Sequence, residues 1–326
     1  MVDGILFPGD IVTDFVTTVP KAELHLHVEG ALEPELAFTL AARNGLTLPF
    51  GDVASLRRAY QFTDLQSFLD LYYACMGVLR TEADFRELAA AYLARAKADG
   101  VTRVEMFFDP QAHVARGVPL ATVIGGLAAA ALAAAQAGGP TVGLIACLLR
   151  DAGPASALAT VESLAEFADA LVGIGLDSTE LGYPPADYRA AFELAGQLGL
   201  RKVAHAGEEG PADFVWQAID VLGAERVDHG IRSVEDRALL RRLAADRTPL
   251  TVCPLSNVRL KAVPSLAAHP LPVLLDAGVH VTVNSDDPAY FGGYIADNYR
   301  AVAGAFGLGE ADVRSLAEAS LAACFT

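Results

Sequence analysis

Two histidines stand two residues apart in a short apolar run of this sequence, at His25 and His27. Alternate residues of a β-strand share one face, so both imidazoles point the same way and can contact one cation. A lone buried histidine is usually an ordinary core residue. Two at this spacing, at the end of a strand, favour a metal site.

Three further runs end in side chains that bind metals or carry protons. His205 closes one run and is a candidate third nitrogen ligand, and Glu208 follows it. His229 closes the next run and brings another imidazole towards the same centre. Asp286 and Asp287 follow a third run; paired acids of this kind also occur in surface turns, but the preceding apolar residues direct them to the interior.

This set of residues predicts hydrolytic chemistry at a metal. Three imidazoles, one carboxylate and a water molecule make a zinc shell. Zinc lowers the pKa of a bound water to about 7, which supplies hydroxide at neutral pH. A glutamate outside the shell, such as Glu208, can then transfer protons.

Short β-branched or apolar runs recur along the chain, each followed by a helical pattern, and we expect eight strands. This alternation predicts an α/β fold, a (β/α)8 TIM-type barrel whose reactive side chains lie at the carboxyl ends of its strands. The runs are Ala22–His27, Val101–Phe108, Thr141–Leu149, Leu171–Asp177, Arg201–Gly207, Arg226–Gly230, Pro249–Ser256 and His280–Asp287.

The connection after the first strand is too long for one helix. We expect residues 1–326 to form a single barrel domain in which residues 31–98 are a helical insertion that covers the mouth as a lid. Asp64 and Thr81 are plausible N-caps for two of its helices. Four aromatic residues there either face a flat substrate or form the insertion's own core: Phe62, Phe68, Tyr72 and Tyr73.

Composition excludes several classes of protein. The formal net charge of −16 repels phosphate backbones, so no nucleic-acid partner is expected. The four cysteines lie far apart, which argues against disulfides or a thiolate zinc site and suits the cytoplasm. Residues Met1–Asp10 lack a signal-peptide pattern. The uncharged stretch Val118–Gly139 is rich in alanine and contains proline and glycine, which predicts a packed helix and no membrane span.

Two absences narrow the chemistry. The small cytidine-type deaminases need Pro-Cys-x-x-Cys, and Cys253-Pro254 has the reverse order. Two-metal barrel hydrolases commonly bridge their ions with a lysine on the fourth strand, and residues 171–182 contain none. We therefore expect one metal ion per subunit.

At this point the sequence resembles the adenosine/adenine deaminase family of the amidohydrolase superfamily, over nearly the whole chain. The motifs that carry the resemblance are Pro20-Lys21-Ala22-Glu23-Leu24-His25-Leu26-His27, His205-Ala206-Gly207-Glu208, Asp228-His229-Gly230, Cys253-Pro254-Leu255-Ser256-Asn257 and Asn284-Ser285-Asp286-Asp287-Pro288.

The resemblance implies a role for each candidate residue. One zinc ion would be held by His25, His27, His205 and Asp286. Glu208 would protonate N1 of a purine, His229 would orient and help deprotonate the attacking water, and Asp287 would hydrogen-bond N7. His229 is alternatively a prop for the metal ligands.

The implied substrate is a small 6-aminopurine, and the resemblance is stronger to the branch that acts on free adenine, giving hypoxanthine and ammonia in purine salvage. Adenosine deaminases typically carry an aspartate where this chain has Glu29. The longer carboxylate would crowd the sugar, or it is an ordinary salt-bridged acid. Contacts to the purine N3 edge fall within residues 177–180 and are not assigned.

Three alternatives remain open from the sequence. The first is a deaminase of a nucleoside, either adenosine or aminodeoxyfutalosine. The second is a metal-bearing, purine-binding protein without turnover, although binding alone requires neither Glu208 nor His229. The third is a phosphoesterase, which the acidic composition and the missing lysine disfavour. The sequence does not predict the oligomeric state.

Overall fold

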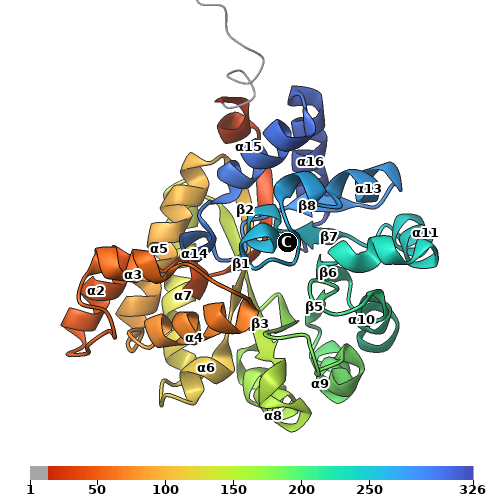
Figure 1. The fold of residues 1–326 in the computed structure, drawn as a ribbon. Helices are drawn as coiled ribbons and strands as arrows, with labels where there is room; N and C mark the ends of the chain where they lie inside the picture. Colours follow the sequence, from red (N-terminus) through yellow and green to blue (C-terminus); the bar gives the residue numbers. More distant parts are fainter. Residues whose placement is uncertain (1–13, 326) are drawn as a thin grey trace, which may run out of the picture.

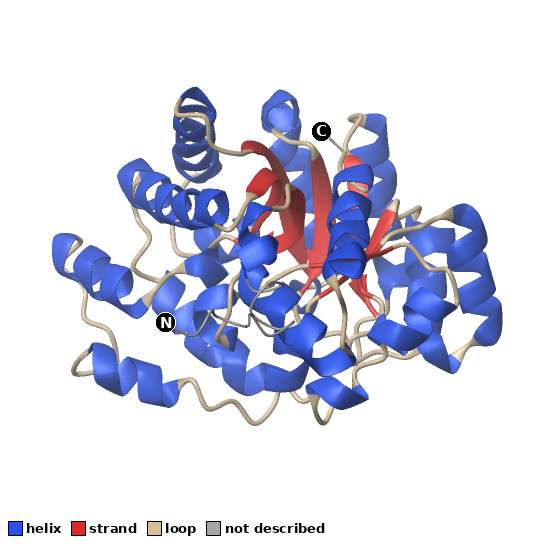
Figure 2. Ribbon diagram, turned by 90° about the horizontal axis from the view of Figure 1, so that it is seen from above, coloured by secondary structure: helices blue, strands red, loops and turns tan. Residues whose placement is uncertain are grey.

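Eight parallel strands form a barrel at the centre of the molecule, and helices surround it (Figures 1 and 2). The structure is a computed structural model that describes residues 14–325. Each strand pairs in parallel with the next along the chain. The strands are β1 (Lys21–His27), β2 (Val101–Phe108), β3 (Thr141–Leu149), β4 (Gly173–Asp177), β5 (Arg201–Ala206), β6 (Arg226–His229), β7 (Leu250–Val252) and β8 (Val281–Val283). The predicted barrel is confirmed.

The last two strands are shorter than the sequence predicts. The run Pro249–Ser256 contains only the three residues of β7, and His280–Asp287 contains only the three residues of β8. Each strand is soon followed by a proline, Pro254 or Pro288, at the first position of a short helix. Proline lacks a backbone N–H but suits the first turn of a helix, so it ends strand pairing at these points.

The barrel closes between β1 and β8 through residues of the predicted site. The backbone N–H of His27 donates to the carbonyl of Asp286 at 3.1 Å, and the N–H of Asp286 donates to the carbonyl of His25 at 3.0 Å. Together these bonds make an isolated parallel bridge between Leu26 and Asp286. The closing hydrogen bonds therefore fix the relative positions of three candidate metal ligands.

Helices cover the outside of the barrel. In the sequence, α2 to α5 follow β1 and precede β2. Of these helices, α5 packs against β2 and α7. The α-helices are α2 (Pro34–Arg43), α3 (Val53–Ala59), α4 (Leu65–Met76), α5 (Glu82–Ala98), α6 (Pro110–Val114), α7 (Leu120–Gln136), α8 (Pro154–Leu164), α9 (Arg189–Gln197), α10 (Ala212–Gln217), α11 (Arg237–Asp246), α12 (Pro254–Arg259), α13 (Leu271–Asp276), α14 (Pro288–Phe291), α15 (Ile295–Phe306) and α16 (Glu310–Ala322). Short single-turn helices occupy several of the loops.

The long first connection has the helix starts that the sequence predicts. The side chain of Asp64 accepts a hydrogen bond from the backbone N–H of Ser67 at 2.8 Å, which caps α4. Thr81 occupies the N-cap position of α5, where the carboxylate of Asp84 accepts its backbone N–H at 2.8 Å. Such contacts satisfy N–H groups that have no partner inside the helix. The division of residues 31–98 from the barrel stays a prediction.

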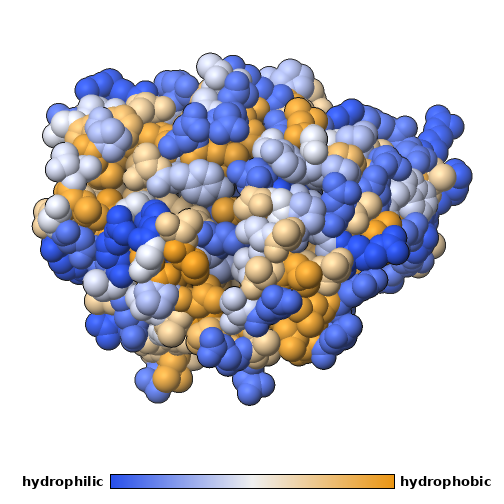
Figure 3. All heavy atoms as spheres, turned by 90° about the horizontal axis from the view of Figure 1, so that it is seen from below, coloured by the Kyte–Doolittle hydropathy of each residue, from blue (hydrophilic) through white to orange (hydrophobic). Residues whose placement is uncertain are grey.

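The alanine-rich stretch forms α7, which packs mainly on α5. A Cβ atom added at Gly126 would meet the backbone oxygen of Glu82 at 2.5 Å, so the two helices approach closely there. Across residues 14–325, no helix is both long and apolar enough to cross a membrane. The surface that Figure 3 shows mixes hydrophilic side chains with separate apolar patches. The Met1–Asp10 prediction lies outside the described residues.

A buried ion pair lies inside the barrel, at the end where the strands begin. Nη1 of Arg226 on β6 donates to Oε2 of Glu105 on β2 at 2.5 Å, and both side chains are fully buried. Nη2 of Arg226 donates to the carbonyl of Leu24, and Oε1 of Glu105 accepts the backbone N–H of Phe325. The pair therefore links three strands and the carboxyl-terminal segment.

We expect Glu105→Ala to lower the free energy of unfolding by about 3–5 kcal/mol, because it leaves a buried guanidinium without its counter-charge. Urea titration followed by circular dichroism measures the loss. The matched control is Arg201→Gln, which breaks an ion pair with Glu225 that is about half exposed and should change the stability by about 1 kcal/mol or less. Equal effects of the two substitutions would contradict the assignment.

Candidate active site

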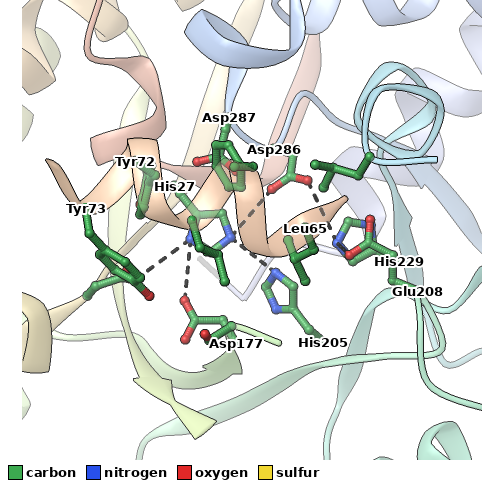
Figure 4. Close-up of a pocket in the computed structure, with 15 residues that line it drawn as sticks. His27, Leu65, Tyr72, Tyr73, Asp177, His205, Glu208, His229, Asp286 and Asp287 are labelled. Atoms are coloured by element: carbon green, nitrogen blue, oxygen red, sulfur yellow. Dashed lines mark hydrogen bonds and ion pairs between the residues drawn. The ribbon is translucent and has the colours of Figure 1, made fainter. Parts of the chain in front are cut away.

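The carboxyl ends of the strands surround a pocket. Its lining comes from the ends of β1, β2, β4, β5, β6 and β8, from α4 and from the segment after α12. Figure 4 shows imidazoles and carboxylates pointing into the pocket. The lining residues are His27, Leu65, Phe68, Leu69, Tyr72, Tyr73, Asp109, Asp177, Ser178, His205, Glu208, His229, Leu260, Asp286 and Asp287.

Four predicted metal ligands converge at the floor of this pocket. Nε2 of His27 lies 3.2 Å from Nε2 of His205 and 3.6 Å from Oδ1 of Asp286. Nε2 of His25 lies 3.4 Å from the same carboxylate oxygen. One oxygen of Asp286 therefore faces both imidazoles of β1, and His205 approaches from the opposite side of the barrel.

In His25 and His205, the ring nitrogen Nδ1 faces a hydrogen-bond acceptor. Nδ1 of His25 lies 3.0 Å from Oγ1 of Thr251, and Nδ1 of His205 lies 3.5 Å from Oδ2 of Asp228. A proton held on Nδ1 by such acceptors leaves the lone pair of Nε2 directed at the pocket. Sequence reasoning assigned no role to Asp228 or Thr251, although Asp228 belongs to a quoted motif.

The donor set fits a metal cation. In the part of the chain that the structure describes, Nε2 of His25 is buried without a hydrogen-bond partner, and the Nε2 atoms of His27 and His205 face each other with no acceptor between them. Ligand atoms about 2.1 Å from a tetrahedral zinc ion lie roughly 3.4 Å apart. The observed separations of 3.2, 3.4 and 3.6 Å match that spacing.

His229 lies close to the same cluster. Suitable atoms of His25, His205, His229 and Asp286 all lie within 4.8 Å of one another, a group that holds His229 in place of His27. However, Nε2 of His229 approaches the other Asp286 oxygen, Oδ2, at 3.9 Å, and lies nearer to Glu208, at 3.4 Å from Oε2. Its assignment outside the ligand set stays a prediction.

Glu208 is buried beside these histidines. Nδ2 of Asn257 donates to Oε1 of Glu208 at 2.9 Å and lies 3.2 Å from Nδ1 of His229. Burial raises the pKa of Glu208 well above its usual value, and the charges of Asp286 and Glu180 raise it further. Glu208 is therefore suited to hold a proton near neutral pH.

Two residues of the Cys253–Asn257 motif support the site, which sequence reasoning did not assign. Oγ of Ser256 donates to Oδ2 of Asp286 at 2.6 Å. Asn257 joins Glu208 and His229 and also accepts from the buried His269, at 3.1 Å. Both come from the start of α12, whose position is set by Pro254 directly after β7. The motif was a signal for these roles, but spacing alone does not reveal partners.

Glu180 is a second residue that sequence reasoning left unassigned. Its buried carboxylate accepts three backbone N–H groups, those of Gly207, Glu208 and Gly210, each at 2.9 Å. Such charge-assisted bonds are stronger than neutral ones. Glu180 therefore holds the loop after β5 in the shape that presents the Glu208 side chain to the pocket.

Asp287 reaches the pocket because its neighbour has no side chain. A Cβ atom on Gly30 would lie 2.0 Å from Oδ1 of Asp287, so only glycine fits there. That oxygen is buried and has no hydrogen-bond partner. Burial and the adjacent charge of Asp286 raise the pKa of Asp287 well above its usual value, so this carboxyl group can carry a proton and donate it in a hydrogen bond.

Three of the five non-glycine residues with positive φ in residues 14–325 lie at the pocket. Ser178, His229 and Asp286 have φ angles of 70°, 62° and 66°, in the left-handed region that non-glycine residues rarely adopt. All three line the pocket and lie at or just after strand ends. Strained conformations of this kind cost about 1–3 kcal/mol each and persist where the surrounding structure fixes them, as at active sites.

The aromatic residues of the first connection separate into two groups. Phe68, Tyr72 and Tyr73, all on α4, line the pocket. Phe62 does not, and instead packs against Tyr60, Phe68 and Phe291. Phe62 therefore lies in the insertion's own core, and a contact of the other three with a substrate stays a prediction.

Glu29 makes two buried hydrogen bonds. Its Oε1 lies 2.7 Å from Nε2 of His113 and accepts the backbone N–H of Asp109 at 3.2 Å. The carboxylate is fully buried and is absent from the described lining of the pocket. The contacts of Glu29 are therefore hydrogen bonds within the fold, and any effect on a sugar is indirect.

The role of Glu180 leads to a prediction. We expect Glu180→Gln to lower the free energy of unfolding by about 2 kcal/mol or more, because an amide presents N–H groups to the three backbone donors. Hydrogen exchange at Gly207, Glu208 and Gly210 should accelerate while exchange in β1 is unchanged. The control is the exposed Glu162→Gln on α8. Unchanged exchange in the loop would refute this role.

Comparison with known proteins places these observations in a family. A protein named adenine deaminase from Streptomyces coelicolor is 59% identical over 312 residues, covering 96% of this chain and 92% of that one. The crystal structure of an adenine deaminase from Arthrobacter aurescens matches with a TM-score of 0.93 and 51% identity, covering 95% of this chain and 94% of that one.

A zinc-bound amidohydrolase from Burkholderia ambifaria matches with a TM-score of 0.90 and 28% identity, covering 100% of this chain and 90% of that one. A family model described as adenosine deaminase matches residues 20–326. The predicted resemblance and the predicted enzyme class are confirmed. This chain belongs to the adenosine deaminase family of the amidohydrolase superfamily and is a hydrolytic deaminase.

Proposed function

We propose that the chain converts adenine and water to hypoxanthine and ammonia. The observation that carries this proposal is a pocket that brings together a cation-binding cluster, Glu208 and Asp287. Both carboxyl groups have raised pKa values, and deamination of an aminopurine uses protonated groups of this kind beside a metal. The adenine deaminases of Streptomyces coelicolor and Arthrobacter aurescens, similar over nearly the whole chain, support adenine as the substrate.

The proposed cofactor is one zinc ion per subunit, held by His25, His27, His205 and Asp286. The spacing of their donor atoms supports this set, and so does the zinc-bound relative from Burkholderia ambifaria. A zinc ion in such a site supplies Lewis acidity, which lets water lose a proton near neutral pH. The amidohydrolase relatives do not identify the ion in this chain, so metal analysis of the purified protein decides it.

The polar groups around the cluster divide the remaining work. Glu208 donates its proton to N1 of the purine and so makes C6 electrophilic. His229, 3.4 Å from Glu208, orients the attacking water and accepts its proton. Asp287 donates a hydrogen bond to N7, so the ring nitrogens on either side of the C6 amino group, N1 and N7, both meet a donor. The preorganised charges stabilise the tetrahedral intermediate. His229 passes the water's proton to the amino group, the C6–N bond breaks and ammonia leaves; the proton lost from the C6 hydroxyl is released and later restores Glu208 to its protonated form.

The helix α4 supplies the cover of the site. Phe68, Tyr72 and Tyr73 line the pocket from this helix, together with Leu65 and Leu69. Aromatic side chains offer flat surfaces that suit a planar base. Together with the leucines they exclude bulk water, which strengthens the electrostatic interactions inside the pocket. We therefore propose that residues 31–98 contribute the lid, with α4 as the part that contacts substrate.

The assignment of Glu208 leads to a prediction. Glu208→Gln should lower kcat for ammonia release roughly 10²- to 10⁴-fold, because the amide keeps the hydrogen bond from Asn257 but has no acidic proton. Metal content and melting temperature should stay at wild-type values. The matched control is Glu209→Gln, one residue along and not in the described pocket lining, which should retain activity. Full activity of Glu208→Gln would rule out the role.

The substrate is tested by an ultraviolet assay with adenine, adenosine and aminodeoxyfutalosine, run on protein whose metal content is measured. We expect kcat/KM to be highest for adenine. Removal of the metal with a chelator should abolish turnover, and added zinc should restore it. If kcat/KM is higher for a nucleoside than for adenine, the nucleoside is the preferred substrate and adenine is rejected. Absence of turnover of all three purines by metal-loaded protein would favour a binding function.

A further inference from the structure

Two carboxyl groups in the pocket are not used by the chemistry proposed above. Asp109 follows β2 and Asp177 ends β4, and both line the pocket. Their side chains are only 2% and 4% exposed, and Oδ1 of each has no hydrogen-bond partner within residues 14–325. A buried polar atom without a partner costs free energy unless a ligand supplies one.

These two acids lie behind His27, away from the metal cluster. Nε2 of His27 faces His205 and Asp286, whereas Nδ1 on the other side of the ring faces Oδ2 of Asp177 at 3.7 Å and Oδ1 of Asp109 at 4.0 Å. In Figure 4, Glu208 and His229 lie on one side of His27, and Asp177 and Tyr73 lie on the other. The pocket thus has two polar ends.

The orientation proposed for adenine places its unused edge at the second end. With N1 at Glu208, C6 at the cluster and N7 at Asp287, the remaining ring nitrogens are N3 and N9. Only N9 carries a hydrogen in the free base, and in a nucleoside the sugar replaces it. The carboxyl groups of Asp109 and Asp177 keep oxygen lone pairs that can accept the N9–H, whether or not the two groups share a proton.

Asp109 is the better placed of the two acids. It occupies the N-cap position of α6, yet its side chain makes no capping hydrogen bond. An aspartate there usually caps the helix, and this one lines the pocket instead. Asp177 is the nearer partner of His27, at 3.7 Å, and its carbonyl accepts from Nε of Arg150 at 3.0 Å.

We propose that Asp109 accepts the N9–H of adenine and thereby selects a free base over N9-substituted purines, an inference that rests on the proposed function. Glu29 acts one step behind, because its carboxylate accepts the backbone N–H of Asp109 and so fixes where that residue lies. The sequence suggested that Glu29 selects against a sugar; in this proposal Asp109 makes that selection directly and Glu29 positions it.

The test compares adenine with 9-methyladenine, which lacks the N9 hydrogen. Wild type should strongly prefer adenine, since a site built to bond an N–H rejects an analogue without it. Asp109→Ala should lower kcat/KM for adenine roughly 10- to 100-fold and leave that for 9-methyladenine equal or higher, so the preference collapses. If 9-methyladenine turns over too slowly, its inhibition constant against adenine serves instead.

Controls separate this role from a structural one. Asp109→Asn keeps the volume of the side chain and an amide oxygen as acceptor, so it should lose less preference than Asp109→Ala. Asp151→Asn, an exposed acid just after β3, should change neither substrate. Metal content is measured in every variant, because Asp109 also faces His27.

Distinct results would overturn the inference. If Asp109→Ala lowers kcat/KM equally for both purines, or loses metal, Asp109 supports His27 and does not contact N9 of the base. Equal use of the two purines by wild type would also refute it. By contrast, wild-type protein that releases no ammonia from adenine would reject the proposed function itself, so the two failures are distinguishable.

Discussion

The crowding of carboxyl groups at the barrel mouth is the constraint on which the rest of the site depends. Ionised carboxylates away from water are costly unless cations, shared protons or N–H donors compensate them. Each kind of compensation is present here. Three imidazoles and Asp286 surround a position fit for a cation, backbone donors satisfy Glu180, and Glu208 and Asp287 have pKa values raised by burial and by neighbouring acids. The same crowding that requires a cation therefore produces proton-bearing acids beside it.

The barrel and the site share their hydrogen bonds. The backbone of Asp286 closes the sheet against His25 and His27, while its side chain faces the imidazoles of those residues. A displacement of β8 would open the barrel and disperse the cluster at once. The left-handed backbone at His229 and Asp286 shows that local conformational preference yields to this arrangement.

Much of this was predictable because barrel strands impose a period of two and send their carboxyl ends to one face. That rule identified His25, His27, His205, Glu208, His229, Asp286 and Asp287 as neighbours, and the structure brings them to one pocket or its floor. It did not identify Glu180, Ser256 or Asn257, whose contacts depend on loop paths and not on strand spacing. Nor did it separate Phe62 from the aromatics of α4, because burial in a core and burial against a ligand give the same pattern.

The placement of the carboxyl groups, each of which can donate or accept a hydrogen bond according to its protonation, lets the pocket match the edges of a purine. In the proposed orientation N1 and N7, which only accept hydrogen bonds, face Glu208 and Asp287, whose surroundings favour the protonated form. N9 of the free base donates, and it faces acids with unpartnered oxygens. In the product N1 carries a hydrogen, and a Glu208 that has given up its proton then accepts from it. The arrangement therefore complements the base on both sides of the reaction.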